Sequence, residues 1–384
     1  MYQNALLSID IAIQIKRGKI TKCYHNLSAF DILLPEVLGM ASSCHCPLSS
    51  IPSNPMELLD SSDENLRLAG AAIAQGKLVV IPTETVYGLG ADAFNPEAVA
   101  RVFEAKARPA FDPLIVHIAR LEDIFRIART LPPKARLLAE KLWPGPLTII
   151  LPKRREVPDI VTSGLDTVAL RFPAHPVARK IIEYSGTAVA APSANPFGYI
   201  SPTTAWHVAS MLGERVDFII DGGPCDVGVE STVIDATGDI LTLLRPGGMP
   251  IERIREIAGE LSIPEKKSSL VTSPGQLASH YAPNARLFLF DYLSLPDAAG
   301  SIAAGRSAAL VLDENRARTI EATGKFERVY ALSGRGDMRE AASRLFALLH
   351  MLDSEGYASI YAERVPDEGL GRAINDRLSR ASRK

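Results

Sequence analysis

The sequence predicts an α/β protein with an open, twisted, mixed sheet, followed by a smaller α/β domain of βαβ type. Two observations support this fold class. From Met56 to about Ile251, short apolar runs of strand length alternate with segments of helical periodicity, which is typical of a sheet covered by helices. The same alternation resumes at Ala285, after a stretch rich in Ser, Pro and Lys. A chain of 384 residues has room for two or three domains.

The first domain opens with a helix over Asn65–Gln75, which we expect to end at Gly76. A second helix begins at Asn95-Pro96-Glu97, because Asn caps helix N-termini and Pro suits the first helical position. The remaining helices are expected near Glu122–Ala128, Pro133–Leu142, Pro176–Tyr184 and Thr203–Leu212. The apolar runs predict strands at Leu78–Ile81, Leu114–Ile118, Leu147–Leu151, Val168–Phe172, Ala188–Ala191, Asp217–Ile220, Val229–Asp235 and Leu241–Leu244.

The second domain follows a segment, residues 260–284, that has the composition of a linker. Strands are expected at Leu287–Phe290, Ala308–Leu312, Arg328–Ala331 and Ser359–Tyr361, and helices near Met338–Leu352 and Gly371–Ser379. The glycines of Gly334-Arg335-Gly336 lack the rest of a phosphate-loop pattern and indicate a plain turn.

Residues 1–55 differ from the rest of the chain, because they have no sustained helix or strand period. We expect a disordered extension, or a start assigned too early, with Met56 opening the regular sequence. Cys44-His45-Cys46 resembles half of a zinc site, but no second ligand pair follows at zinc spacing, so we predict no protein metal site.

The composition is that of an ordinary globular protein, with 47% hydrophobic and 22% charged residues. The formal net charge of −2 gives no global signal for nucleic-acid binding, although it leaves room for a local basic patch. No apolar run reaches the length of a membrane span, so we expect no membrane contact. Four cysteines in a chain of this length favour a reducing, cytoplasmic location over a disulfide framework.

The segment Pro82–Gly90 places a polar, glycine-rich stretch directly after the strand Leu78–Ile81. Open α/β sheets bind ligands at such strand ends, and Gly88 and Gly90 would let a backbone or ligand approach closely. An ordinary tight turn explains the same residues equally well. The segment alone does not decide between the two interpretations.

Three cations lie in positions that suit an anionic ligand. Lys106 and Arg108 follow the helix that begins at Asn95, where they would cap the helix or clamp an anion. Arg171 interrupts an apolar strand and therefore needs a partner, either a ligand carboxylate or a structural acid. His117 lies in the strand Leu114–Ile118, whose alternation turns it toward solvent or a cleft.

Small polar turns follow several other strands: Pro192-Ser193-Ala194-Asn195-Pro196, Asp221-Gly222-Gly223 and Leu244-Arg245-Pro246-Gly247. Glu230-Ser231-Thr232 opens the strand that ends at Asp235, and Ser201 precedes a helix whose N-terminus favours phosphate. No Ser-His-Asp order or thiolate motif is visible. The set favours binding and polarising an anionic substrate over a covalent enzyme intermediate.

With these motifs in place, the sequence resembles the YrdC/Sua family of threonylcarbamoyl-AMP synthases. The resemblance covers roughly residues 60–255 and rests on PTETVYGLG (82–90), KARPAFDPLIVH (106–117), WPGPLT (143–148), RFPAHP (171–176), APSAN (191–195), SPT (201–203), DGG (221–223), ESTVID (230–235) and LRPG (244–247). SPGQLASHYAP (273–283) resembles the linker of the longer, two-domain members.

The resemblance implies a YrdC-like catalytic domain over residues 56–259, a linker over 260–284 that closes over the active site, and a Rossmann-like domain over 285–384. The implied reaction joins L-threonine, bicarbonate and ATP into threonylcarbamoyl-AMP and pyrophosphate. A magnesium ion on the phosphates is expected, without a dedicated protein cage. A partner transferase would then move the threonylcarbamoyl group onto tRNA, next to the anticodon.

The site residues that the resemblance implies fall into two groups. The nucleotide group, with Lys106 and Arg108 also expected to be catalytic, is Lys106, Arg108, Asp112, Thr167, Ser193, Asn195, Ser201, Arg245 and Tyr281. The threonine group is Thr85, His117, Arg171, Ala191 and Ser231, with Arg171 expected to pair with the threonine carboxylate and Ala191 to act through its backbone.

Two positions depart from the family pattern. Ala107 stands where glycine is common, which we expect to be harmless. Asp112 stands where a neutral Asn or Ser is usual, and an acid beside phosphates weakens binding unless magnesium or Lys106 offsets it.

Two other functions remain open from the sequence. One is a carbamoyltransferase of the related hydrogenase-maturation type, but its acylphosphatase and zinc-finger modules are not visible in the chain. The other is a binder of double-stranded RNA with at most a weak contact, against which the net charge of −2 argues mildly.

Overall fold

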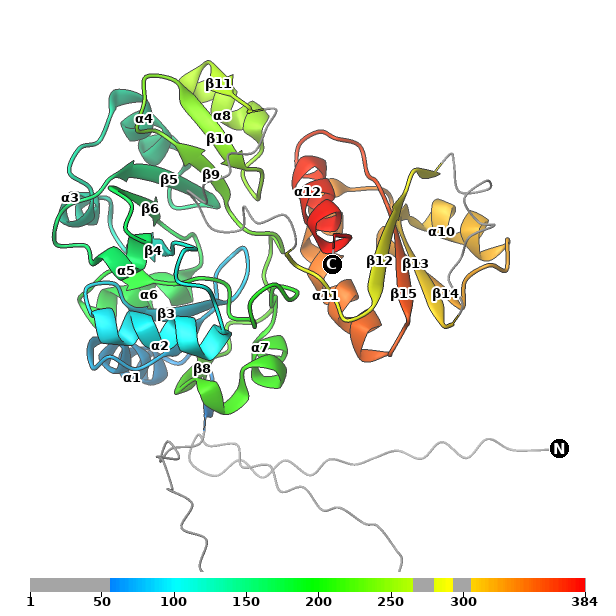
Figure 1. The fold of residues 1–384 in the computed structure, drawn as a ribbon, viewed down its shortest axis with the longest axis horizontal. Coiled ribbons are helices and arrows are strands. Elements are labelled where there is room, and N and C mark those ends of the chain that lie inside the picture. The colour runs from blue at the N-terminus through cyan, green and yellow to red at the C-terminus, as the bar shows by residue number, and fades with distance from the viewer. Residues whose placement is uncertain (1–55, 265–279, 293–304, 384) are drawn as a thin grey trace, which may run out of the picture. The chain divides into compact units, whose positions relative to one another are not determined.

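The computed structural model describes residues 56–264, 280–292 and 305–383. The expectation for residues 1–55, and most of the expected linker, lie outside these described residues. The predicted fold class is confirmed: the described chain contains one large mixed sheet and one small parallel sheet, each with helices packed on it (Figure 1).

The large sheet has 11 strands within the described residues, in the order β1-β8-β2-β3-β7-β4-β6-β5-β9-β10-β11. Parallel and antiparallel neighbours alternate irregularly: β4 runs parallel to β6, for example, and β6 antiparallel to β5. The strands are β1 (Glu57–Leu59), β2 (Val79–Ile81), β3 (Gly88–Asp92), β4 (Ile115–His117), β5 (Leu147–Pro152), β6 (Thr167–Arg171), β7 (Val189–Ala190), β8 (Phe218–Ile220), β9 (Thr232–Asp235), β10 (Leu241–Arg245) and β11 (Leu261–Ser262).

Helices cover both faces of this sheet. Helices α1 (Asp63–Ala74) and α6 (Pro176–Ser185) pack on one face, beside β2 and β8. The other face is covered by α2 (Pro96–Lys106), α3 (Ile124–Ile127), α4 (Pro133–Leu142), α5 (Asp159–Thr162), α7 (Ala205–Met211) and α8 (Ile251–Ala258). Short 3₁₀ turns lie at Leu121–Asp123 and Gly213–Arg215. Because α1 and α6 lie beside β2 and β8, they leave the same face of β4, β6, β5 and β9 available for a site.

Local sequence explains the helix that leads to Lys106. The Asn95 side chain accepts hydrogen bonds from the backbone N–H groups of Glu97 and Ala98, as a helix N-cap does, and Pro96 occupies the first position. The helix ends at Ala107, which has a left-handed φ of 51°. This backbone suits glycine better than alanine, because glycine has no Cβ to resist a positive φ.

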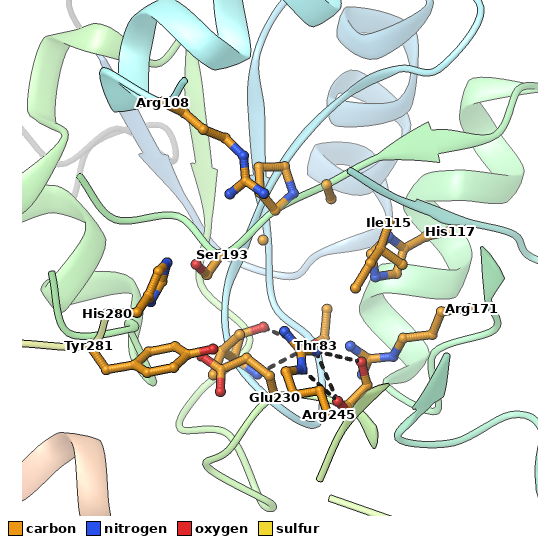
Figure 2. A pocket seen from close by; sticks show the side chains of 15 residues that line it. Thr83, Arg108, Ile115, His117, Arg171, Ser193, Glu230, Arg245, His280 and Tyr281 are labelled. Carbon is orange, nitrogen blue, oxygen red and sulfur yellow. Dashed lines mark hydrogen bonds between the residues drawn. The ribbon is translucent and has the colours of Figure 1, made fainter. Parts of the chain in front are cut away.

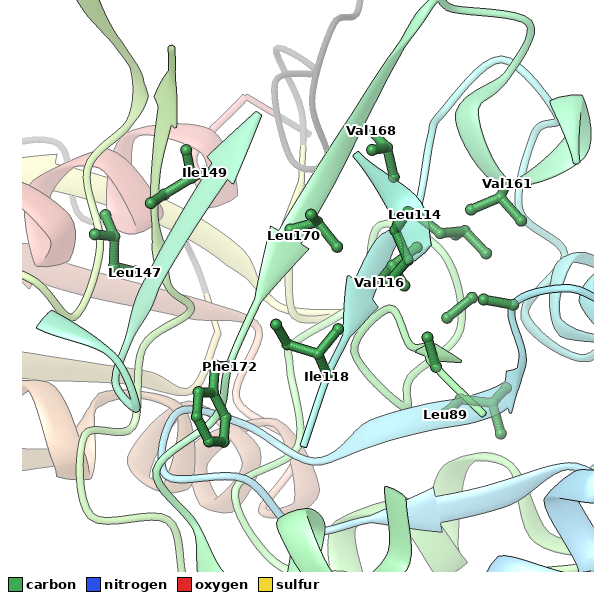
Figure 3. Packing of buried hydrophobic residues seen from close by; sticks show 14 of the residues in the cluster. Leu89, Leu114, Val116, Ile118, Leu147, Ile149, Val161, Val168, Leu170 and Phe172 are labelled. Atoms are coloured by element: carbon green, nitrogen blue, oxygen red, sulfur yellow. The ribbon is translucent and has the colours of Figure 1, made fainter. Parts of the chain in front are cut away.

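Alternation along β4 separates the hydrophobic core from the open face. Leu114, Val116 and Ile118 point into the core cluster beneath the sheet, together with Leu170 (Figure 3). The intervening residues of β4 point to the opposite face, as the period of two requires. The sequence-based expectation that His117 faces away from the core is confirmed.

Several elements were not predicted from the sequence. The largest difference is β3 (Gly88–Asp92), because its first three residues were interpreted as part of the polar segment Pro82–Gly90 and no strand was predicted there. A Cβ at Gly90 would lie 2.9 Å from a Val189 side-chain carbon and 3.0 Å from the Val79 carbonyl oxygen, so the glycine allows strands to pack closely. The short elements β1, β11 and α5, and the helices α8 and α10, were also missed.

The second domain has four parallel strands in the order β12-β15-β13-β14. They are β12 (Arg286–Phe290), β13 (Ser307–Asp313), β14 (Arg328–Ser333) and β15 (Ser359–Glu363). Helices α11 (Met338–Ser354) and α12 (Gly371–Ala381) pack on one face, and α10 (Glu314–Glu321) packs on the other. The cluster under α11 and α12 also contains Val86, Ile200 and Val229 of the first domain, so the two domains share buried apolar surface.

Candidate active site

A small, partly open cavity lies where several strands of the large sheet end. Its volume is about 40 Å³, enough for a few water molecules. Strands β3, β4, β6 and β10 line it, together with the loops after β2 and β7, the loop before β9, and two linker residues, His280 and Tyr281. Strand ends of an α/β sheet are where such folds bind ligands.

The cavity has two sides, which Figure 2 separates clearly. Ile115, His117 and Arg171 form the sheet side. Arg108, Ser193, His280 and Tyr281 form the linker side, and Thr83, Glu230 and Arg245 lie between the two.

The sheet side is a row of neighbouring strand residues. His117 is in register with Arg171 on the adjacent strand, and Arg171 with Thr148 on the next. The Thr148 and Ser231 hydroxyls are hydrogen-bonded at 2.7 Å. Burial, with the charge of Arg171, lowers the pKa of His117 to about 3, so the imidazole is neutral near pH 7. Its Nδ1 atom has no hydrogen-bond partner among the described residues.

Arg171 is paired with an acid from the first strand-end segment. Its Nη2 lies 2.8 Å from Glu84 Oε1, and the two side chains are only 4% and 8% exposed. The Arg171 Nε has no hydrogen-bond partner within the part of the chain that the structure describes. The sequence left open whether Arg171 pairs with a ligand carboxylate or with a structural acid. In the structure its partner is a structural acid, Glu84, and its Nε donor remains available to a ligand.

Arg108 is paired with Asp112 on the linker side. Its Nη2 lies 2.9 Å from Asp112 Oδ2, and it also donates to the backbone carbonyl of Pro113 at 3.0 Å. Burial raises the pKa of the Asp112 carboxyl, and the charges of Arg108 and Lys106 counter part of that effect. We expected magnesium or Lys106 to offset Asp112, whereas the ion-pair partner in the structure is Arg108.

Lys106 lies behind the cavity wall. Its Nζ donates hydrogen bonds to the backbone carbonyls of Ser193 and Asn195, which fixes the turn that follows β7. Burial, followed by the charge of Arg108, lowers the pKa of Lys106 well below its ordinary value. The Asn195 amide donates to the carbonyls of Pro196 and Tyr199, both at 2.9 Å, and so orders the same loop.

Arg245 reaches the cavity from the end of β10. Its Nη2 donates to the Ser231 carbonyl at 2.8 Å and to the Ser231 hydroxyl at 3.2 Å. Gly247 makes this approach possible, because a Cβ there would lie 2.3 Å from the Glu230 carbonyl oxygen. The strand end and the loop before β9 are thus held together around Arg245.

The second domain contacts residues of the cavity wall. Arg377 on α12 pairs with Glu230 at 2.6 Å, and its guanidinium lies 5.0 Å from the centre of the Tyr281 ring. Tyr281 is buried and has a left-handed φ of 64°. Such a backbone is rare for a residue with a bulky side chain, and strained residues of this kind cluster at functional sites.

Of the site residues expected from the sequence, eight line the cavity: Arg108, His117, Arg171, Ala191, Ser193, Ser231, Arg245 and Tyr281. Lys106, Asp112, Asn195, Ser201 and Thr85 are buried next to these but do not line it. Thr85 instead shares a 2.9 Å hydrogen bond with Thr83, and Thr83 is the residue that faces the cavity. The roles of these residues remain predictions.

Thr167 does not line the cavity either. It begins β6, four residues before Arg171, which is about 13 Å at 3.3 Å per strand residue. Its proposed contact with the nucleotide is not explained by this cavity.

Seven residues that line the cavity were not among the predicted site residues, although Gly88 and Glu230 had been singled out as parts of strand-end motifs. Ile115, Gly88, Pro192 and Val86 supply shape, and Thr83, Glu230 and His280 supply polar groups. Glu84 and Arg377 do not line the cavity but pair with residues that do. Glu84 and Glu230 each stand beside a predicted site residue in the sequence, and an acid in that position is a usable signal for a charge partner.

Across the described residues, no group of three or more His, Cys, Asp or Glu side chains could hold a metal ion. None of the helices in the described ranges is long and apolar enough to cross a bilayer.

The fold and the cavity together define an α/β enzyme whose buried, arginine-rich site suits anionic substrates. Two sequence profiles of known families match the chain and identify the class of enzyme more closely. The one described as "Telomere recombination" matches residues 71–247, and the one described as "Threonylcarbamoyl-AMP synthase, C-terminal domain" matches residues 249–383.

The chain belongs to the YrdC/Sua family, as its resemblance indicated. It is 43% identical to the threonylcarbamoyl-AMP synthase of Pyrococcus abyssi over 321 residues, which cover 83% of this chain and 94% of that protein. It is 39% identical to the Bacillus subtilis enzyme of the same name over 333 residues, which cover 84% and 94% of the two chains. The crystal structure of P. abyssi Sua5 complexed with L-threonine is 41% identical, with a TM-score of 0.77 over 86% of this chain and 96% of that one.

Proposed function

We propose that this chain is a threonylcarbamoyl-AMP synthase, a nucleotidyltransferase that joins L-threonine, bicarbonate and ATP and releases pyrophosphate. The observation that carries the proposal is the asymmetry of the cavity. Its sheet side offers a buried guanidinium and a neutral imidazole, and its linker side offers a second guanidinium, from Arg108, and the Ser193 hydroxyl. An amino acid suits the first side, and a nucleotide suits the second.

The reaction requires two bonds to form in sequence. Threonine nitrogen forms a bond to the bicarbonate carbon, and loss of one bicarbonate oxygen as water gives a carbamate. A carbamate oxygen then attacks the α-phosphorus of ATP, and the bond to pyrophosphate breaks. In our proposal the free Nε donor of Arg171 binds the threonine carboxylate, and the Glu84 pair holds the guanidinium in place. Arg245 lies between the two sides and would stabilise the charge that develops on the phosphate.

Lys106 would act on the reaction through position. By holding two carbonyls of the Ser193–Asn195 turn, it sets where the Ser193 hydroxyl points into the cavity. A misplaced turn would weaken catalysis even though the lysine does not touch the substrate, because near-attack geometry tolerates little displacement.

Magnesium bound to the triphosphate belongs to the proposed reaction, but the residues around the cavity do not supply a protein cage for it. The carboxylates of Glu84, Asp112 and Glu230 are each paired with an arginine in the described structure. Magnesium prefers carboxylate and phosphate oxygens with several waters, so the triphosphate itself is the better ligand.

The adenylate product would be passed to a separate threonylcarbamoyl transferase that modifies tRNA. That use of the product favours a cytoplasmic location. Direct contact of this chain with tRNA is not needed for the chemistry.

The test is product formation by the purified protein with ATP, threonine and bicarbonate, followed by mass spectrometry of the nucleotide and by pyrophosphate release. We expect threonylcarbamoyl-AMP only when all three substrates are present. Equal pyrophosphate release with serine, or without bicarbonate, would contradict the assignment.

Two variants connect the activity with the cavity. Arg171→Ala and Lys106→Ala should lose turnover while the protein stays folded, as measured by circular dichroism. Because Arg171→Ala strands the buried Glu84 carboxylate, the double variant E84Q/R171M is the matched control: it removes both charges and should restore stability without restoring activity. Unfolding of every one of these variants would return the residues to a structural role.

A further inference from the structure

The cavity wall contains a carboxylate, Glu230, at a place where the proposed substrates are anions. Glu230 lines the cavity between its two sides and is only 6% exposed. An uncompensated carboxylate there would repel a triphosphate or take Arg245 as its own partner. The structure contains a counter-ion for it, and that counter-ion comes from the second domain.

Arg377 of α12 forms an ion pair with the Glu230 carboxylate. Its side chain is 0% exposed, and its Nε donates to Glu230 Oε2 at 2.6 Å. Its Nη1 donates to the Pro246 carbonyl at 3.0 Å, next to Arg245 in the chain. Burial alone would raise the pKa of Glu230, but the charges of Arg377 and Arg245 outweigh this effect and hold the pKa below its ordinary value, so Glu230 is ionised.

The fixed carboxylate in turn holds a predicted nucleotide contact. Glu230 Oε1 accepts a 2.5 Å hydrogen bond from the Ser201 hydroxyl. The Ser201 carbonyl lies 3.1 Å from His350 Nε2 on α11. Ser201 is therefore tied to the second domain twice, once through His350 directly and once through Glu230 and Arg377.

The backbones of the two domains are in close contact next to Glu230. A Cβ at Gly228, two residues before Glu230, would lie 2.4 Å from the Ser343 Cα of α11. The guanidinium of Arg377 also lies 5.0 Å from the Tyr281 ring centre, a cation–π contact with a cavity residue. These contacts bring α12 and the cavity wall together as one packed unit.

We propose that Arg377 is a positioning residue for nucleotide binding. It neutralises Glu230, and the paired carboxylate accepts the hydrogen bond from the Ser201 hydroxyl, so the second domain sets the charge of the cavity wall beside the nucleotide. This inference rests on the proposed function only in taking ATP as the nucleotide.

The first experiment measures ATP binding to the full chain by calorimetry, which needs no turnover, together with KM for ATP and for threonine. Arg377→Met should weaken ATP binding at least about tenfold, because it leaves a buried carboxylate unpaired beside the phosphates. The KM for threonine should change less than about threefold, since the sheet side does not contact Arg377. Unchanged ATP affinity in Arg377→Met would overturn the proposal.

The second experiment separates neutralisation from docking. Arg377 also pairs with Asp376 at 2.8 Å, but Asp376 keeps a second partner, Arg380, at 2.8 Å. In the double variant E230Q/R377M no stranded charge is left, so ATP affinity should recover to within about threefold of the original protein. If the double variant binds ATP as poorly as Arg377→Met, the arginine serves only to dock the domain, and the proposal is wrong. If Arg377→Met does not fold, E230Q/R377M is compared with Arg377→Lys instead. Arg377→Lys keeps the positive charge but loses the planar guanidinium that can donate two hydrogen bonds.

The matched control is Arg372→Met on the same helix. Arg372 also joins the two domains, at 3.4 Å from Glu252, but its side chain is 32% exposed and does not line the cavity. It should bind ATP like the original protein. Absence of threonylcarbamoyl-AMP from the original protein would refute the proposed function, whereas the calorimetric comparison would still decide the role of Arg377.

Discussion

Asp112→Asn tests the electrostatics of the linker side directly. The pair with Arg108 is separated by 2.9 Å, which corresponds to an attraction of about 6 kcal/mol at an effective dielectric constant of about 20. Burying the carboxylate offsets much of this, as the raised pKa of Asp112 indicates. Arg108 also keeps two backbone acceptors, the carbonyls of residues 112 and 113. We therefore expect a net loss of about 2 kcal/mol of unfolding free energy, below the usual cost of breaking a buried pair.

The same substitution should improve nucleotide binding. With its acidic partner gone, Arg108 is free to pair with phosphate, so KM for ATP should fall about fivefold to tenfold while the melting temperature falls by about 4 °C. Both are measured on one preparation, by pyrophosphate release at varied ATP and by thermal unfolding. Asp63→Asn is the surface control, because its pair with Arg67 is 49% and 64% exposed and should matter by less than about 0.5 kcal/mol. A raised KM for ATP with an unchanged melting temperature would refute the reasoning.

Three further outcomes are expected. His207 and His350 stack between the domains, and burial lowers their pKa values to about 4 and about 3, so both are neutral when folded. In the unfolded chain both histidines bind protons below about pH 6.5, so their contribution to the unfolding free energy should be complete above that pH and should fall as the pH drops toward 4. Melting curves measured across this pH range should show a smaller drop for the variant H207Q/H350Q. Gly247→Ala should cost at least about 2 kcal/mol and raise KM for ATP, because its Cβ would meet the Glu230 carbonyl at 2.3 Å; unchanged melting and kinetics would contradict this. Lys106→Met should lower unfolding free energy by about 2 kcal/mol, since it strands two carbonyls, and chemical denaturation measures that loss.

The sequence predicted most of the elements that carry the site, because the signals for them are local. The Asn95-Pro96 start of α2 and the alternation of Leu114–Ile118 each follow from a few neighbouring residues, and both are confirmed. Strand β3 was missed because its glycines have low strand propensity, and only close packing against Val189 explains them.

The charge partners of the site could not be predicted in the same way. Glu230 and Arg377 lie 147 positions apart, and nothing local indicates that they meet. The i, i+4 spacing of Ala373, Arg377 and Ala381 does place the arginine on the buried face of α12, and a buried arginine indicates a charge partner. The identity of that partner depends on how the two domains pack, which short-range patterns do not encode.

The alternation along β4 and β6 also limits how this protein can evolve. Each strand presents core residues on one face and His117 or Arg171 on the other. Inserting or deleting one residue inside either strand would exchange the two faces, so that charged groups enter the core and leucines line the cavity. Insertions in the lineage should therefore accumulate in loops away from these strands, while the lengths of β4 and β6 stay constant.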